Sequence, residues 1–320
     1  MTSYSDNERK KLKKNSSELP SGSVSGKPGR RVTSALGVWD ARIVTLISAV
    51  CILVMAFILY FLISESLPVL KATSLQDLLF GMDWYPQEEP PALGMAPLIV
   101  GTFIVSLLSC VLGIPASLAI ALFIAEIAPR RVRNFLKPVL ELLGFLPSIV
   151  FGFLGMTLIA PWLQQEFGVL TGLNVLTASF LLGVMMIPTV GSLADEALCA
   201  VPDELRAASY ALGATRWETL SRVVLPAAAP GILSASLLGI MRSAGETMVV
   251  LMAAGGAAII PRSLMGPVRP LTSAIAAEMG ETPVGSEHYH ALFFAGFVLL
   301  ILTLIVNLAA ERIERSRRFR

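Results

Sequence analysis

Residues 202–226 read PDELRAASYALGATRWETLSRVVLP, a polar, charged and amphipathic stretch between two strongly apolar ones. Gly213 supplies the backbone freedom needed where two short helices turn. Pro226 disfavours helical geometry in Leu225, so we predict a helix–turn–helix whose second helix ends at Leu225–Pro226. A membrane protein has little reason to hold such a segment at a bilayer face unless a partner docks on it. An amphipathic helix on the membrane surface is the alternative, but it does not explain the spacing from Gly213 to Leu225.

The rest of the chain is too apolar for a soluble domain of its size. Of its 320 residues 54% are hydrophobic and 15% charged, and the mean hydropathy is +0.71. Stretches of about 20 apolar residues cross the roughly 30 Å hydrocarbon core as helices. We predict an all-α membrane protein with six transmembrane helices, at 43–63, 96–125, 139–159, 173–193, 231–254 and 291–310. Residues 1–42 are expected to form a disordered basic tail, 43–310 the six-span domain and 311–320 a basic C-terminus.

Lysine and arginine are distributed unevenly between the two sides of this arrangement. The tail, the loop at 130–137, the segment 202–226 and the C-terminus contain 21 of them, and the opposite loops contain three. Basic loops stay in the cytoplasm. We therefore expect both termini and residues 202–226 to be cytoplasmic. A segment that meets a cytoplasmic partner must lie on that side, so the two inferences agree.

Arg242 and Glu246 lie within the fifth predicted span. An arginine at the bilayer centre costs about 2.5–3.5 kcal/mol on insertion scales, so it is rarely without a role. Four residues separate the two, which places them on one helix face where they can pair. One interpretation is a neutral ion pair that joins helices. The other is that Arg242 attracts an anion along a pathway, while Glu246 holds the guanidinium in place and lowers its affinity for the anion.

Pro147 and Pro188 are expected to break two spans, either beside a cavity or as packing kinks. His288 and His290 have no further ligand in sequence and favour an interfacial position over a metal site. The three cysteines have no zinc or disulfide spacing. Arg262 and Arg269 are expected either to dock a partner or to be solvated. We expect no cofactor, no metal and no nucleic-acid partner.

Five motifs occur in an order that resembles the permease of the high-affinity phosphate ABC importer, a binding-protein-dependent type I importer. Glu-Thr-Met within the last of them is similar to the PstC-type rather than the PstA-type subunit. They are ELLGFLPSIVFG at 141–152, MIPT at 186–189, VPDELR at 201–206, ALGATRW at 211–217 and RSAGETM at 242–248. The resemblance covers about residues 40–315. It implies that Arg242, Glu246 and Thr247 belong to the substrate pathway.

The same resemblance makes residues 202–226 a coupling loop that seats on an ATPase. The family pattern is E-A-A-x3-G-x9-I-x-L-P, and this chain departs from it at two positions, with Ala207 for Glu and Ser209 for the third residue. The loss of that Glu removes its salt bridge to the ATPase, for which Glu204 or Arg206 are candidate substitutes. The expected coupling residues are Glu204, Arg206, Ala207, Ala208, Ser209, Gly213, Leu225 and Pro226.

The implied partners are a PstA-type second permease, two ATPase subunits, an extracytoplasmic phosphate-binding protein, phosphate and membrane lipid, in a bacterial plasma membrane. The chain has no G-x-x-x-x-G-K-[ST] motif, so ATP hydrolysis must come from another subunit and this chain is not an enzyme. Two alternatives stay open. One is a permease for molybdate, tungstate or sulfate. The other is a membrane component that mainly senses phosphate.

Overall fold

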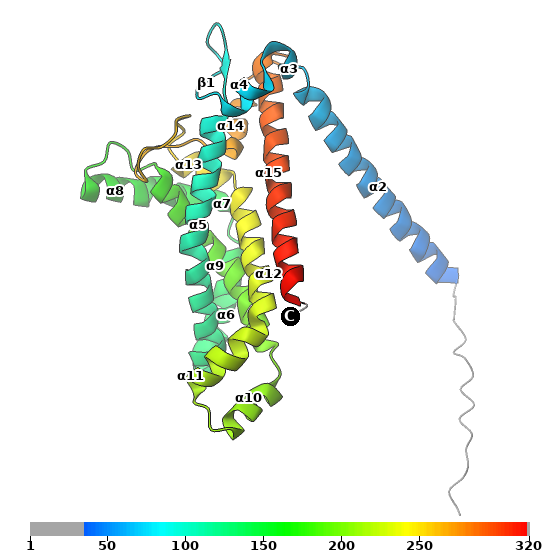
Figure 1. Ribbon diagram of the computed structural model, residues 1–320, viewed down its shortest axis with the longest axis vertical. Coiled ribbons are helices and arrows are strands. Elements are labelled where there is room, and N and C mark those ends of the chain that lie inside the picture. Colours follow the sequence, from blue (N-terminus) through cyan, green and yellow to red (C-terminus); the bar gives the residue numbers. More distant parts are fainter. Residues whose placement is uncertain (1–34, 319–320) are drawn as a thin grey trace, which may run out of the picture. The chain divides into compact units, whose positions relative to one another are not determined.

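The computed structural model describes residues 35–318 (Figure 1). The chain forms two compact units, Met1–Phe57 and Ile58–Arg320, and helix α2 (Ala35–Ser66) has residues in both. The predicted disordered tail falls largely outside the described residues. The prediction of disorder is wrong for the end of that tail, because residues 35–42 are already helical. This part contains no proline and several good helix formers, so the helix of the first span extends toward the N-terminus.

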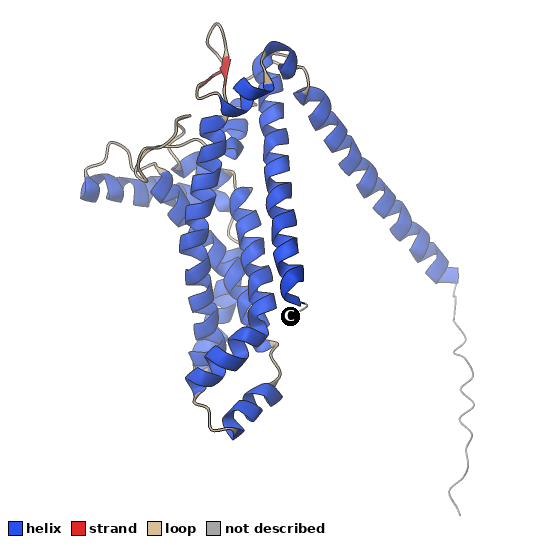
Figure 2. Cartoon of the chain, viewed as in Figure 1, coloured by secondary structure: helices blue, strands red, loops and turns tan. Residues whose placement is uncertain are grey.

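The described chain is almost entirely helical (Figure 2), with one two-residue antiparallel pair in which Trp84 faces Leu93. The prediction of an all-α protein is confirmed. The elements after α2 are α3 (Val69–Ala72), α4 (Leu75–Phe80), β1 (Trp84–Tyr85), β2 (Ala92–Leu93), α5 (Ala96–Leu122), the π-turn η1 (Phe123–Ile127), α6 (Arg130–Gly144), α7 (Ser148–Leu154), the π-turn η2 (Gly155–Ile159), α8 (Ala160–Phe167), α9 (Val175–Cys199), α10 (Asp203–Ala211), α11 (Arg216–Thr219), the π-turn η3 (Leu220–Val224), α12 (Leu225–Ala244), α13 (Met248–Ala253), α14 (Leu271–Glu278) and α15 (Glu287–Arg318).

Within the described residues, six helical stretches are long and apolar enough to cross a membrane, which confirms the predicted number of spans. They are Arg42–Ala72, Ala96–Ile127, Ser148–Phe167, Val175–Cys199, Arg216–Ala244 and Glu287–Arg312.

The third crossing is interrupted as Pro147 predicts, because α6 ends at Gly144 and α7 begins at Ser148. Length and composition alone start this span at Ser148. The predicted bounds of 139–159 are therefore wrong, because this span is Ser148–Phe167. Helix α6 precedes it in the chain and packs on α9, with Leu140 over Gly191, while Gly155, the first residue of η2, lies against Leu181.

Two expectations about the other spans are wrong. Helix α9 continues through Pro188 without a break. It is the most enclosed of the six described spans, and its neighbours hold the backbone helical despite the missing N–H. The fifth span does not run from 231 to 254. It starts at Arg216 and ends at Ala244, where Gly245 caps α12, and α13 starts anew at Met248.

Helix α9 packs closely against α5 because small residues face each other. A Cβ on Gly113 of α5 would lie 2.9 Å from the Cα of Gly183 of α9, so any larger residue there would separate the backbones. Close approach of this kind is how helices associate in lipid, where no hydrophobic force drives them together. The tight pair forms the axis around which α12, α6 and α7 pack, and it fixes the level of the polar groups described next.

Candidate functional site

Arg242 lies in the last turn of α12, half-buried, and points to α9. Its Nη1 donates to the Thr189 hydroxyl oxygen over 2.6 Å. In the part of the chain that the structure describes, the guanidinium forms no ion pair, so the expected pairing with Glu246 is wrong. The result is a positive charge at membrane depth that one neutral oxygen contacts, with most of its N–H donors available.

Glu246 lies beyond the end of α12, which removes the i, i+4 geometry that predicted the pair. Its carboxylate accepts instead from the backbone N–H of Met248 over 3.2 Å. Its backbone carbonyl accepts from the Thr272 hydroxyl over 2.9 Å. Gly245 to Thr247 are therefore non-helical between two helices, with Thr247 half-buried beside Glu246. Irregular backbone at this depth is tolerated where it is buried in protein or lines a cavity.

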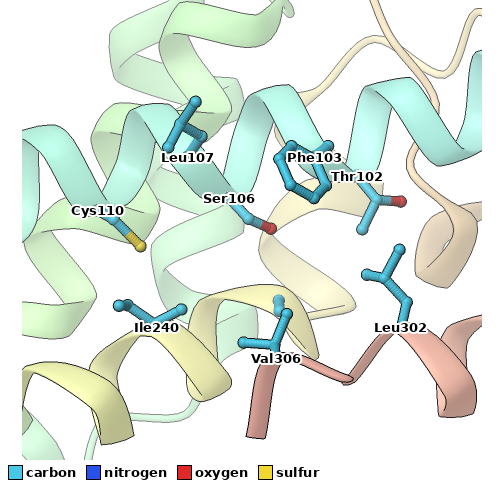
Figure 3. A pocket seen from close by; sticks show the side chains of 9 residues that line it. Thr102, Phe103, Ser106, Leu107, Cys110, Ile240, Leu302 and Val306 are labelled. Atoms are coloured by element: carbon cyan, nitrogen blue, oxygen red, sulfur yellow. The ribbon is translucent and has the colours of Figure 1, made fainter. Parts of the chain in front are cut away.

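The end of α12 is also fixed to α5. The hydroxyls of Ser243 and Ser109 lie 2.5 Å apart and are buried. Neighbouring this contact is a pocket of about 140 Å³ between α5, α12 and α15 (Figure 3). Phe103, Leu107 and Ile240 are among the side chains that line it, so it offers little to compensate a desolvated anion. Arg242 does not line this pocket.

The predicted turn in 202–226 is confirmed. Helix α10 ends at Ala211, and Gly213 adopts the left-handed φ of +83°. Helix α11 then begins with a capping box formed by Thr215 and Glu218. The predicted end at Leu225–Pro226 is wrong, because α11, η3 and α12 form one continuous helical stretch. The π-turn lets the Leu225 N–H reach the Leu220 carbonyl, and this wider turn accommodates the proline that follows.

The expected coupling residues separate into exposed and internal ones. Glu204, Ala207 and Ala208 are exposed on α10, as docking requires. Ser209 is buried instead, and its hydroxyl lies 2.9 Å from that of Thr219. It therefore joins the two short helices and leaves no exposed room for a partner. Two further expected coupling residues lie after the turn: Leu225 is half-buried and Pro226 is exposed.

Arg206 also has internal partners. Its Nη1 lies 2.5 Å from Glu126 Oε1, and its Nη2 donates to the Leu198 carbonyl over 3.0 Å. It does not serve as the proposed substitute for a salt bridge to an ATPase, because these two acceptors already occupy both ends of the guanidinium fork.

Sequence reasoning missed the apolar character of this end of the bundle. Leu212 is 89% exposed, and Trp217 is 71% exposed. Tyr210 and Trp217 also line an open pocket of about 480 Å³. Large exposed apolar side chains that gather in this way mark interaction sites. We call Glu204, Ala207, Ala208, Leu212 and Trp217 the docking surface; the signal for its aromatic part was present in the ALGATRW motif.

The basic segment 130–137 is not a loop as predicted, because it forms the first half of helix α6, and it is only partly solvated. Lys137 Nζ lies 2.9 Å from Asp195 Oδ2, and Arg133 Nη2 lies 3.9 Å from Asp195 Oδ1. The hydrogen bond with Asp195 raises the pKa of Lys137. Asp195 is 1% exposed near the end of α9, so these two cations compensate a buried negative charge. Arg130 and Arg131 are exposed.

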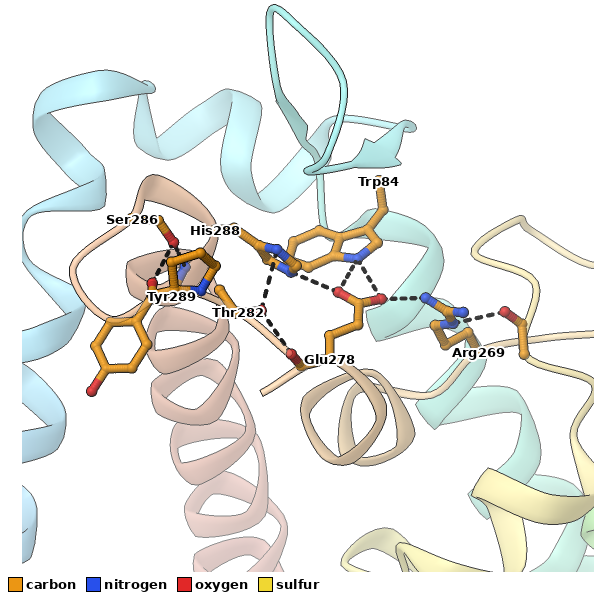
Figure 4. Close-up of polar contacts among 9 residues, drawn as sticks. Trp84, Arg269, Glu278, Thr282, Ser286, His288 and Tyr289 are labelled. Carbon is orange, nitrogen blue, oxygen red and sulfur yellow. Dashed lines mark hydrogen bonds and ion pairs between the residues drawn. The ribbon is translucent and has the colours of Figure 1, made fainter. Parts of the chain in front are cut away.

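At the opposite end of the bundle, Glu278 accepts hydrogen bonds from three segments (Figure 4). Its carboxylate pairs with Arg269, accepts from Trp84 Nε1 over 3.1 Å and contacts His288 Nε2 at 2.8 Å. Arg269 also donates to the Gly256 carbonyl over 2.7 Å. Arg269 therefore has partners within the chain and is only partly solvated, whereas Arg262 is exposed.

The fold and these sites define a polytopic membrane protein with an unpaired intramembrane arginine and an exposed apolar surface on a short helix pair. Residues 113–319 match the family described as "binding-protein-dependent transport system inner membrane component". The chain belongs to this family, and it is a permease component. The match begins within α5 and includes both the docking surface and Arg242.

Relatives and solved structures agree with this assignment. A probable ABC transporter permease protein, YqgH, of Bacillus subtilis is 37% identical over 76% of this chain and 78% of its own length. The phosphate transport system permease protein PstC of Xylella fastidiosa (strain Temecula1) is 34% identical over 80% of this chain and 86% of its own.

Among solved structures, a bacterial alginate ABC transporter in complex with its pentasaccharide-bound periplasmic protein is 15% identical with a TM-score of 0.61. The similarity covers 87% of this chain and 95% of that one. It shows the fold of a type I importer permease.

Proposed function

We propose that this chain is the PstC-type permease subunit of an ATP-driven phosphate importer in a bacterial plasma membrane. A heterodimer with a PstA-type permease receives phosphate from an extracytoplasmic phosphate-binding protein and releases it into the cytoplasm by alternating access. Two ATPase subunits bind at the docking surface, which lies with both termini on the cytoplasmic side. Relatives that are 30–34% identical over most of the chain are named phosphate transport permeases, which supports phosphate over other oxyanions.

The observation that carries this proposal is the unpaired guanidinium of Arg242. A neutral ion pair would offer a dianion no net attraction, whereas a lone arginine does. Thr189 holds the side chain without neutralising it. A full cage of arginines would trap the anion and prevent its release. One cation with a single neutral partner is a compromise between attraction and release, and half-burial leaves its remaining donors open to a passing oxyanion.

The coupling half of the proposal rests on the docking surface. Leu212 at the end of α10 and Trp217 on α11 are both exposed, and the small side chains of Ala207 and Ala208 are exposed on α10. Closure of the ATPase dimer on binding ATP then moves α10. That motion reaches the spans through the continuous helix from Arg216 to Ala244, whose last turn contains Arg242.

The test is phosphate uptake by cells in which Arg242→Gln replaces the wild-type chain, with assembly of the complex checked by co-purification. Two unit charges about 6 Å apart interact with about 3 kcal/mol at an effective dielectric constant of about 20. We expect uptake to fall at least about tenfold while assembly is retained. Arg131→Gln removes an exposed charge of the same kind and should leave uptake unchanged.

Near-normal uptake by Arg242→Gln would refute the pathway role. Competition separates the substrates. Excess sulfate, molybdate or tungstate should not reduce phosphate uptake by the wild-type complex, and equal competition by one of them would reassign the substrate. Normal uptake in cells that lack the chain, together with lost control of the phosphate-starvation response, would favour the sensing function.

A further inference from the structure

Arg206 joins three elements at the α10 end of the bundle. The residue is on α10, and its guanidinium contacts Glu126 of η1 at 2.5 Å and the Leu198 carbonyl of α9 at 3.0 Å. Its Nε also lies 3.8 Å from the fully exposed Asp203. The side chains of Arg206 and Glu126 are only 20% and 18% exposed, so the pair is partly shielded from water and salt.

The local backbone explains why these groups meet. The π-turn η1 ends α5, and the residue that a π-turn inserts changes the direction of the side chains that follow. Glu126 thereby faces α10. The Leu198 carbonyl is at the last turn of α9, where unsatisfied carbonyls and the helix dipole favour a cation. The planar fork of arginine presents donors to both acceptors in one fixed geometry, whereas the ammonium of lysine is a compact point charge.

The two helices that Arg206 contacts are the same two that hold the end of α12. Thr189 of α9 binds Arg242, and Ser109 of α5 binds Ser243. Helices α5 and α9 are in close contact at Gly113 and Gly183. A force applied to α10 can therefore reach Arg242 through this rigid pair, in addition to the continuous helix that starts at Arg216.

We propose that the Arg206–Glu126 pair is a positioning element that makes α10 move as one body with the ends of α5 and α9. This inference rests on the proposed function, because it assigns a route for the motion that ATP drives. It does not place Arg206 in contact with an ATPase. Its role is to keep α10 from yielding locally when the ATPase subunits close, so that the motion displaces the spans.

The experiment is a charge exchange in the complete complex reconstituted with its ATPase subunits and binding protein. Arg206→Glu and Glu126→Arg are made singly and together, and ATP hydrolysed per phosphate imported is measured in proteoliposomes. We expect each single change to raise this ratio at least about fivefold, because like charges then face each other. The double change should recover part of this loss but not all of it, because it restores the ion pair but leaves a carboxylate at residue 206 beside the Leu198 carbonyl. Arg131→Glu reverses an exposed charge on α6 and should leave the ratio unchanged.

A double variant that assembles but is no better coupled than either single variant would overturn the proposal, as would normal coupling in Glu126→Arg alone. Loss of the ATPase subunits from Arg206→Glu, with normal ATPase retention and coupling in Glu126→Arg, would show that Arg206 binds the ATPase instead. If the reversed charges prevent assembly, Arg206→Gln with Glu126→Gln tests the same pair. That variant should assemble and be uncoupled, and wild-type coupling in it would also overturn the proposal.

Failure of the proposed function has a different signature. A wild-type complex that imports no phosphate would refute phosphate transport. The interaction between Arg206 and Glu126 is then measured by thermal unfolding of the purified complex. The double exchange should unfold at a higher temperature than either single variant if the two side chains interact. Additive losses would overturn the inference whatever the substrate is.

Discussion

Replacing Glu278 by glutamine tests the polar cluster at the α14 end of the bundle, which joins segments from four parts of the chain (Figure 4). The carboxylate is 13% exposed and accepts from Arg269, Trp84 and His288. These residues come from β1, from the loop before α14 and from the start of α15. Glutamine keeps the shape and removes the charge, so any loss reports on the electrostatic contribution.

The magnitude follows from the contacts. Hydrogen bonds to charged groups contribute about 1.5–3 kcal/mol each, and removing one partner of a buried pair costs about 3–5 kcal/mol. Glutamine keeps one acceptor oxygen but turns an NH₂ group toward donors. Because Arg269 is 27% exposed and partly screened by solvent, we expect a loss of about 2–4 kcal/mol. For a chain of this size that lowers the unfolding temperature by roughly 3–6 °C.

The assay is thermal unfolding of the purified complex in detergent, with Glu281→Gln as the matched control. Glu281 lies just after Glu278 at the end of α14 and is exposed, so its change should cost less than about 0.5 kcal/mol. A shift for Glu278→Gln no larger than that of the control would refute the argument. It would mean that the cluster is solvated and that its contacts do not hold the four segments together.

Three further outcomes are expected. Gly113→Ala should lower the free energy of unfolding by about 1–3 kcal/mol, because its Cβ would meet the backbone of Gly183; an unchanged unfolding temperature would contradict the close pair. Gly213→Pro should uncouple ATP hydrolysis from uptake without preventing membrane insertion, since φ of +83° is inaccessible to proline, and normal uptake would remove this turn from coupling. In a chain without its native cysteines, a cysteine at Ser316 should resist impermeant thiol reagents in intact cells and one at Gln87 should react. The reverse pattern would refute the proposed orientation.

Hydrophobicity and turn chemistry were enough to predict the frame of the molecule. A run of about 20 apolar residues has few folds available in lipid, so the six spans follow from composition. Gly213 was predictable because a left-handed residue between two short helices favours glycine. Pro147 was predictable because it falls between two good helical segments. Each of these inferences depends on residues that are close in sequence.

The contacts of the site depend on residues that are far apart in sequence, and these were not predictable. The i, i+4 spacing of Arg242 and Glu246 predicts a pair only while the helix continues, and α12 ends between them. Thr189 is 53 residues from Arg242, and its hydroxyl gives no signal of its own. Glu126 is 80 residues from Arg206, and a π-turn, which has no sequence signature, sets its direction.

The end of α12 at Ala244 changes how the intramembrane charge has to be understood. Had the helix continued, Glu246 would have neutralised Arg242, and the site would offer an anion no net charge. Because the backbone opens at Gly245, the carboxylate is occupied by the Met248 N–H and the guanidinium keeps its charge. Leaving that charge uncompensated costs a few kcal/mol in the membrane. In the proposed function, a dianion bound beside Arg242 would remove that cost, so the same break that destabilises the empty site would favour its occupation.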